Sequence, residues 1–232
     1  MPEQVNFRTT LNRRLLLGSL VAAGGLALAG PARAMSLPNP GTRQIAFDIR
    51  REGASIGRHE VRFNRKGERL EVDVDIDIAV SLAFIPIFSY RHRTHEVWQD
   101  GRLVALDSET DDDGTALAVS ARQRADGLWV SGAEGDFLAP AAVLPTSYWN
   151  PLTVRQTSLL DSQHGRLLEV RPAFVGMERL AEGPARRYRL SGDLEADLWY
   201  TGDEWVKIAF EARGADVSYA RRDLGRGVGT SG

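Results

Sequence analysis

The sequence contains no cysteine. Disulfide bonds, metal sites held by thiolates and a lipid anchor on a cysteine are therefore excluded. Lysine is scarce as well, since Lys66 and Lys207 are the only two lysines in the chain. After residue 34, no stretch is apolar over the roughly 20 residues that a membrane-spanning helix needs. We therefore expect no stable membrane anchor.

The sequence also lacks the signatures of common cofactors. It has no binding motif for flavin, nicotinamide, haem or iron–sulfur clusters. The glycine-rich run at 225–229 follows the last predicted strand and precedes no helix, so it does not fit a phosphate-binding loop. We therefore expect no cofactor.

The first 34 residues have the three parts of an export signal. Arg13 and Arg14 are followed by an apolar run to Ala29, and Ala32 and Ala34 form an A-x-A cleavage site. The paired arginines favour the twin-arginine export machinery. The apolar run is shorter than a spanning helix, so cleavage after Ala34 is favoured over anchoring. The sequence thus predicts a periplasmic protein.

The rest of the chain is mildly acidic. The whole chain has a net charge of −2, and the first 34 residues hold four arginines and one glutamate, so the remainder carries −5. This charge argues against nucleic acid and against a polybasic contact with anionic lipid. The length suits one domain. We predict a linker at 35–43, a single domain at 44–224 and a disordered tail at 225–232.

Apolar side chains recur at every second position along most of the domain. At 70–78, leucine, valine and isoleucine alternate with acids, so one face of a strand is dry and the other is wet. A helix would scatter those acids around its circumference. Asp-Gly dipeptides at 100–101, 113–114 and 126–127 are typical of tight hairpins. The pattern indicates an antiparallel meander.

These signals predict an all-β domain with about eleven strands and little helix. A sheet of this size tends to curl, and a single strongly curved antiparallel sheet makes a half-barrel or barrel whose inner face can hold a ligand. Segment 132–151 has three prolines and no clear period, so we predict a long loop, of the kind that often serves as a lid. For 153–163, a short helix and an irregular turn both remain open.

Four segments carry a resemblance to known proteins: FDIRREGASIG at 47–57, WQDGRL at 98–103, PTSYWN at 145–150 and GDLEADLWY at 192–200. With them, the chain resembles a group of uncharacterised exported bacterial proteins that carry one β-rich domain. The resemblance spans about residues 44–223 and implies the same fold, and it brings no catalytic residues. In layout, the chain is also similar to periplasmic half-barrels of the lipoprotein-carrier type.

The segment 78–88 interrupts the alternation, because most of its residues are apolar. It predicts either a fully buried strand or an apolar rim over a cavity. Aromatic residues of the proline-rich segment could face it, since an aromatic ring with one polar atom suits the mouth of a pocket for a long apolar molecule. The candidate ligand-binding residues are Phe84, Ile85, Ile87, Phe88, Trp98, Tyr148 and Trp149.

Polar clusters have simpler interpretations than metal binding. In a strand, His95 points away from the face that His92 and Glu96 share, and those two are roughly 13 Å apart. The acidic run at 109–114 lacks the ligand spacing of a calcium loop. The acids at 73–77 fit the wet face of a strand better than a glycosidase pair. We expect no bound metal.

A serine hydrolase remains an alternative. Ser147, Asp161 and His164 lie close together in the sequence, although no G-x-S-x-G elbow surrounds Ser147 and no S-x-x-K motif occurs. His92 and His95 are further candidates for such a site.

The sequence best predicts a soluble periplasmic carrier of an apolar or lipid-like ligand, without enzymatic activity. An envelope hydrolase and a structural module that binds partners through strand edges are the alternatives.

Overall fold

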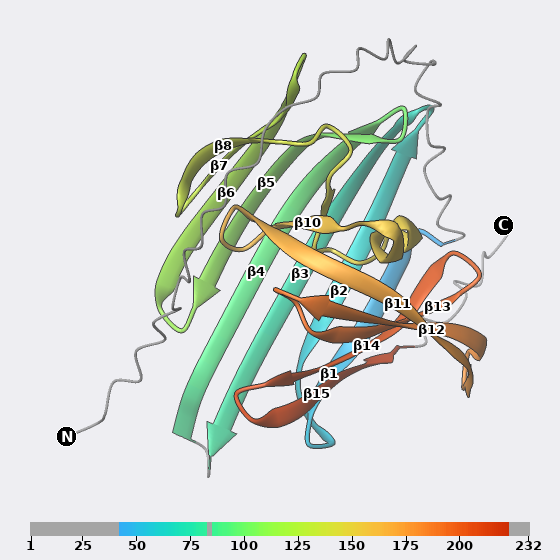
Figure 1. The fold of residues 1–232 in the computed structure, drawn as a ribbon. Helices are drawn as coiled ribbons and strands as arrows, with labels where there is room; N and C mark the ends of the chain where they lie inside the picture. The colour runs from blue at the N-terminus through green and yellow to red at the C-terminus, as the bar shows by residue number, and fades with distance from the viewer. Residues whose placement is uncertain (1–41, 83–84, 223–232) are drawn as a thin grey trace, which may run out of the picture. The chain divides into compact units, whose positions relative to one another are not determined.

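The computed structural model describes residues 42–82 and 85–222, which form fifteen strands and one short 3-10 helix, η1 (Pro151–Arg155) (Figure 1). The predicted export signal with Arg13, Arg14, Ala32 and Ala34 lies outside these residues, as do Phe84 and the tail at 225–232. In chain order, the strands are β1 (Gln44–Arg51), β2 (Ala54–Lys66), β3 (Arg69–Leu82), β4 (Ile85–Gln99), β5 (Arg102–Asp112), β6 (Thr115–Arg124), β7 (Gly127–Gly132), β8 (Gly135–Ala139), β9 (Leu144–Pro145), β10 (Ser158–Asp161), β11 (Arg166–Leu180), β12 (Gly183–Gly192), β13 (Ala196–Thr201), β14 (Glu204–Ala212) and β15 (Ala215–Arg221).

The strands belong to one sheet, in the order β8 to β1 followed by β15 to β9. Two meanders, which we call the first arm (β1–β8) and the second arm (β9–β15), are joined where β1 pairs with β15, for example Ile49 with Tyr219. Every pair is antiparallel except β9 with β10. The predicted all-β meander is therefore confirmed.

The predicted strand count and barrel shape are wrong. The described residues form fifteen strands rather than about eleven, and the sheet is open, because β8 and β9 stand at its two ends and do not pair with each other. Segment 132–151 is not one long loop, since it contains β8 and β9. Segment 153–163 contains the end of η1 and β10. These strands have two to five residues each, too few for a visible period.

The two arms lie across each other instead of forming one evenly curled layer. Figure 1 shows β11–β14 in front of β2–β4. Side-chain contacts between the arms support this arrangement. The hydroxyl of Tyr90 donates to Gln163 over 3.1 Å, and the guanidinium of Arg213 lies 4.4 Å from the ring centre of Phe88. The main apolar core contains residues of both arms, including Leu70 and Leu198.

The outer face of the first arm carries the acids that the sequence alternation predicted. Asp75 of β3 pairs with Arg62 of β2 and with Arg93 of β4, each over 2.8 Å. On the opposite face of β3, Leu70 and Val72 are fully buried. The two faces of this strand are therefore dry and wet as expected, and the exposed ion pairs contribute modestly to stability, about 0.2–1 kcal/mol each.

A buried carboxyl fixes the proline-rich segment to the first arm. Glu96 of β4 is fully buried, and its Oε2 accepts hydrogen bonds from the indole N–H of Trp98 over 2.8 Å and of Trp149 over 3.0 Å. Burial raises the pKa of Glu96, and the hydrogen bonds from Ser147 and the two indoles only partly offset this effect. Removal from water thus favours the neutral acid.

We expect Glu96→Gln to keep a free energy of unfolding close to that of the parent at pH 7, because an amide oxygen still accepts from both indoles. Glu96→Ala leaves two buried N–H groups without an acceptor, which costs about 2–6 kcal/mol. Urea unfolding measures both, and the exposed Glu109→Gln and Glu109→Ala serve as the matched control with changes below about 0.5 kcal/mol.

The difference in free energy of unfolding between Glu96→Gln and the parent should also depend on pH. Because the pKa of Glu96 is raised in the folded state, its stabilising contribution is present below the ordinary pKa and is lost as pH rises through the folded pKa. The glutamine variant has no such loss. A glutamine variant as unstable as the alanine variant would show instead that the fold needs a charged carboxylate.

Candidate functional site

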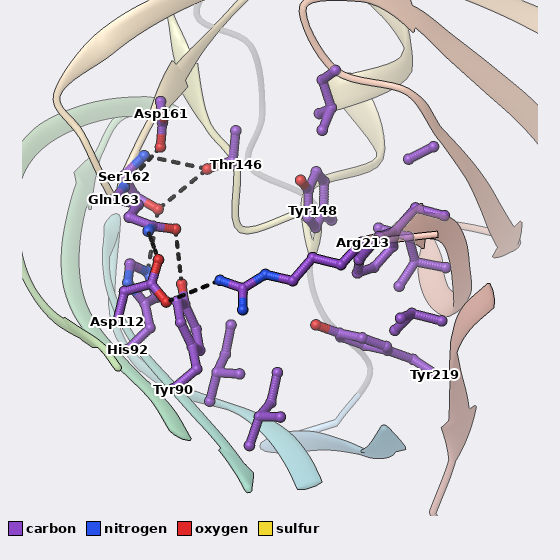
Figure 2. A pocket seen from close by; sticks show the side chains of 18 of the residues that line it. Tyr90, His92, Asp112, Thr146, Tyr148, Asp161, Ser162, Gln163, Arg213 and Tyr219 are labelled. Atoms are coloured by element: carbon purple, nitrogen blue, oxygen red, sulfur yellow. Dashed lines mark hydrogen bonds and ion pairs between the residues drawn. The ribbon is translucent and has the colours of Figure 1, made fainter. Parts of the chain in front are cut away.

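A pocket of about 640 Å³ opens between the two arms (Figure 2). Its wall on the first arm comes chiefly from β3 and β4, and its wall on the second arm from β14 and β15. Thr146, Tyr148 and residues 161–163 also line it. The pocket therefore depends on contacts between parts of the chain that are far apart in sequence.

The apolar part of the pocket continues the dry face of the strands. Along β3, Leu70, Val72 and Val74 are buried in the core, whereas Ile76 and the two following inward residues are half-buried and line the pocket. Further apolar residues of both arms complete the lining, and one of them, Ile87, is 54% exposed. The larger set is Ile56, Ile76, Ile78, Val80, Ile87, Phe88, Leu168, Leu194, Ala196, Ile208, Phe210, Ala212 and Val217.

His92 belongs to a buried hydroxyl network in the wall of the pocket. Its Nδ1 lies 2.8 Å from Thr110 Oγ1, and its Nε2 lies 2.9 Å from Thr94 Oγ1 and 3.3 Å from Ser162 Oγ. Burial lowers the pKa of His92 to about 4. The imidazole is therefore neutral at pH 7 and is suited to hydrogen bonding rather than to holding a charge.

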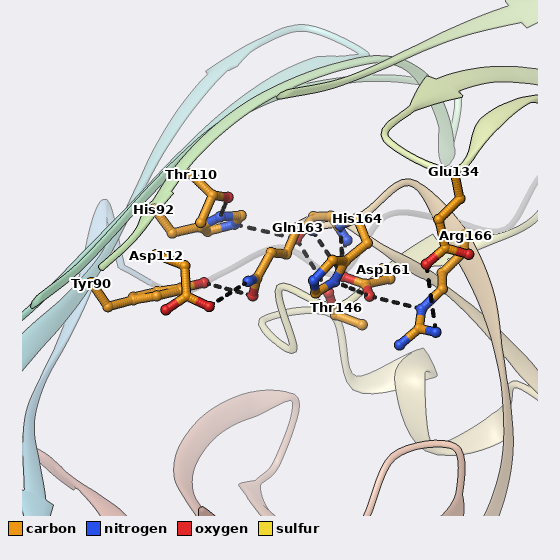
Figure 3. A network of polar contacts seen from close by, with 11 residues as sticks. Tyr90, His92, Thr110, Asp112, Glu134, Thr146, Asp161, Gln163, His164 and Arg166 are labelled. Atoms are coloured by element: carbon orange, nitrogen blue, oxygen red, sulfur yellow. Dashed lines mark hydrogen bonds and ion pairs between the residues drawn. The ribbon is translucent and has the colours of Figure 1, made fainter. Parts of the chain in front are cut away.

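Asp161 organises the turn between β10 and β11 (Figure 3). Its carboxylate lies 2.8 Å from His164 Nδ1, accepts from the backbone N–H of Gln163 over 2.9 Å and pairs with Arg166 over 3.4 Å. The Gln163 side chain then accepts from Tyr90 and donates to Asp112 over 3.5 Å. The turn thus connects the second arm to the first.

Three phenol groups and one guanidinium face the hollow of the pocket in Figure 2: those of Tyr90, Tyr148, Tyr219 and Arg213. Tyr148 has a left-handed backbone with φ of 60°, and its carbonyl oxygen accepts from the hydroxyl of Tyr200 over 2.7 Å. Few residues other than glycine adopt this conformation, so neighbouring contacts must hold it.

The structure places the predicted ligand-binding residues in different surroundings. Ile87, Phe88 and Tyr148 line the pocket, and Ile85 is exposed at the start of β4. Trp98 and Trp149 are buried, with their rings 5.3 Å apart around Glu96. Sequence reasoning did not identify the other polar residues of the pocket. They are Arg51, Tyr90, Asp112, Thr146, Ser162, Gln163, Arg166, Asp193, Arg213 and Tyr219.

The residues of the hydrolase alternative form no triad in the described chain. His164 pairs with Asp161, but Ser147 is buried beside Glu96 and has no contact with His164. Ser162 approaches His92, whose other nitrogen meets the hydroxyl of Thr110 rather than a carboxylate. A carboxylate in that place is what orients and stabilises the imidazolium in a Ser-His-Asp site.

The sequence also contains one G-x-S-x-G pattern, at 53–57. It lies where β1 turns into β2, and Ser55 is exposed. A nucleophile elbow requires a strand followed by a helix, so this hairpin does not have the geometry of one.

Metal-binding residues do not converge in the part of the chain that is described. His95 faces outward and lies 2.7 Å from Asp73, while His92 faces inward, and no group of three histidine or acidic side chains is arranged to hold an ion. Within the same residues, no helix has the length and apolar character to span a bilayer.

Comparisons with known proteins agree with the fold. The profile of a family described as a domain of unknown function, DUF6134, matches residues 47–222. The chain belongs to the DUF6134 family. The predicted relationship to an uncharacterised β-rich family is thereby confirmed at this level.

A solved structure has a related fold: the crystal structure of a β-barrel-like protein of domain of unknown function DUF1849 from Brucella abortus. It is 10% identical, with a TM-score of 0.56 over 77% of this chain and 94% of that chain. No curated protein matches the sequence. At this identity the likeness concerns the fold alone.

A buried histidine supports the aromatic wall behind Tyr219. His59 is almost fully buried among Phe47, Trp205 and Tyr219, and neither ring nitrogen has a hydrogen-bond partner in the described chain. Burial lowers the pKa of His59 from 6.5 to about 3, and the nearby His92 adds to this effect. The folded protein therefore keeps this imidazole neutral.

We expect His59→Phe to make the protein less sensitive to acid. Between the ordinary pKa and the folded pKa of His59, the unfolded chain binds more protons, so stability falls as pH falls through that window. From pH 7 to pH 4 the parent should lose about 3 kcal/mol more than the variant, measured by urea unfolding. The exposed Ser55→Ala removes no titratable group, so it is the control and should behave as the parent does. Equal losses in the parent and in His59→Phe would contradict this role.

Proposed function

We propose that the protein is a non-enzymatic binding or carrier protein for an apolar or lipid-like molecule, which it holds in the pocket between the arms. The observation that carries this proposal is a pocket of about 640 Å³ whose lining includes thirteen apolar residues from both arms. Pockets for small molecules are commonly 300–1,000 Å³, concave and mostly apolar, with a few polar groups.

The decrease in burial of the inward side chains along β3 supports a role for their surface in binding rather than in the core. Val74 is buried, but Ile76 and Ile78 on the same face are half-buried, although β3 is paired on both sides. Their accessible surface is the surface that lines the pocket. Covering apolar surface with a ligand is favourable by about 25 cal/mol per Å². An apolar ligand would therefore complete a core that the side chains leave incomplete.

The fold is compatible with this proposal but does not carry it. The arms of one large sheet lie across each other, and the pocket lies between them. The hydroxyl network around His92 and the missing carboxylate partner favour binding over hydrolysis.

Filling the pocket with a larger side chain should weaken binding. Ala212 of β14 lines the pocket and is half-buried, so Ala212→Phe places a ring in the space that a ligand would occupy. We expect the parent to bind a neutral naphthylamine dye with a stoichiometry near one and the variant to bind it at least about tenfold more weakly, measured by fluorescence titration.

Glu211→Phe is the matched control, because Glu211 is exposed on the opposite face of the same strand. It should bind the dye as the parent does, and all three proteins should show the same unfolding midpoint. Equal dye binding by Ala212→Phe and the parent would place the dye on an outer surface. No binding by the parent to the dye or to long-chain amphiphiles would refute the carrier proposal.

We also infer that the protein acts in the periplasm after twin-arginine export and cleavage after Ala34. Arg13 and Arg14, the apolar run and the A-x-A site support this inference. The exported form should begin at Met35 by N-terminal sequencing, and replacing Arg13 and Arg14 with lysine should remove it from the periplasmic fraction. A periplasmic form that keeps residues 1–34 would contradict cleavage.

A further inference from the structure

The pocket offers hydrogen-bond donors that no acceptor of the protein uses. The hydroxyls of Tyr148 and Tyr219 make no hydrogen bond to any described residue, although Tyr219 is only 7% exposed. The hydroxyl of Tyr90, in contrast, donates to Gln163. Both side chains line the pocket, so a ligand that displaces water from it must offer these two hydroxyls an acceptor or leave them unpaired.

Arg213 adds a third group of unused donors. It stands in the turn between β14 and β15, its side chain is 70% exposed, and its guanidinium lies over the ring of Phe88. Its nearest ionic partner is Asp112, whose carboxylate oxygen is 4.0 Å away, beyond hydrogen-bond distance. Figure 2 shows this guanidinium between the hydroxyls of Tyr90 and Tyr219.

The two phenols remain donors at any physiological pH. Burial raises the pKa of Tyr219, and burial together with the nearby Tyr219 and Asp161 raises that of Tyr148. A protonated phenol can donate to an oxygen atom but has no means of neutralising a cation. The acceptor that fits this end of the pocket is therefore an oxygen, such as a carbonyl or carboxylate oxygen.

We propose that the ligand is an acyl chain, whose oxygen atoms accept hydrogen bonds from Tyr148 and Tyr219 while its hydrocarbon tail lies along the wall of β3 and β14. This inference rests on the proposed function and adds the chemical class of the ligand. A plain hydrocarbon would leave both hydroxyls unpaired. An amine would bring a second cation beside Arg213, and the carboxylates of the lining are already engaged: Asp112 and Asp161 accept from Gln163, and Asp193 accepts from the backbone N–H of Glu169. Acyl groups occur as free acids or as esters, and in both the acyl carbon carries an oxygen atom that accepts hydrogen bonds.

A series of ligands with one chain length tests the inference: a methyl ester, a free acid, an amine and a hydrocarbon, each displacing the dye from the full-length protein. We expect the ester and the acid to bind the parent more tightly than the amine and the hydrocarbon. Tyr219→Phe should weaken the ester and the acid about threefold to tenfold and leave the hydrocarbon unchanged. Tyr148→Phe should act in the same direction.

Tyr188→Phe is the matched control, because Tyr188 of β12 is half-buried and does not line the pocket. It should leave every affinity unchanged. Arg213→Gln distinguishes the two sources of the acyl group. Weaker binding of the acid alone identifies a free carboxylate beside Arg213, and unchanged binding of both ligands identifies an ester; either result supports an acyl ligand.

Failure of this inference is separable from failure of the carrier proposal. If Tyr219→Phe weakens the hydrocarbon as much as the ester, or if the amine binds the parent as tightly as the acid, the acyl assignment is wrong while binding in the pocket stands. If the parent binds no member of the series and no dye, both proposals are wrong.

Discussion

One buried carboxyl group determines where the proline-rich segment lies. Glu96 accepts from Trp98 on its own strand and from Trp149 across the interior, so the segment after β9 is fixed against the first arm. From the second arm, Tyr200 donates to the carbonyl oxygen of Tyr148, the residue directly before Trp149. The segment is thus held by both arms at adjacent residues. These two contacts hold the unfavourable backbone conformation of Tyr148 and present its side chain to the pocket.

The pocket exists because the space between the arms is filled unequally. Near Glu96, the large side chains of Trp98 and Trp149 meet in a solid core. Farther along the arms, the second arm presents Ala196 and Ala212 to the lining. Small side chains there leave a volume that isoleucine and valine of β3 do not fill. The same inward face of one strand therefore serves as core at one end and as pocket wall at the other.

Two-residue periodicity predicted the long strands and their faces, but it could not predict what lies opposite each face. The alternation at 70–78 placed the acids of β3 outside and its aliphatic residues inside, as observed. Trp98 and Trp149 were expected near a ligand, yet they are packed in the core, because periodicity cannot distinguish a filled interior from a hollow one. Tyr219 and Arg213 come from the other end of the chain and meet β4 only through the crossing of the arms. Strands β8, β9 and β10 were missed because they are too short to show a period.

The central claim is that an acyl chain occupies the space between the arms, and a crystal structure with a brominated acyl ester tests it most directly. The anomalous signal of bromine should lie beside Ile76 and Ile78, with the ester carbonyl oxygen about 3 Å from the hydroxyl of Tyr219. Bromine on an outer face of the sheet, or a pocket filled by its own side chains in that crystal, would contradict the claim.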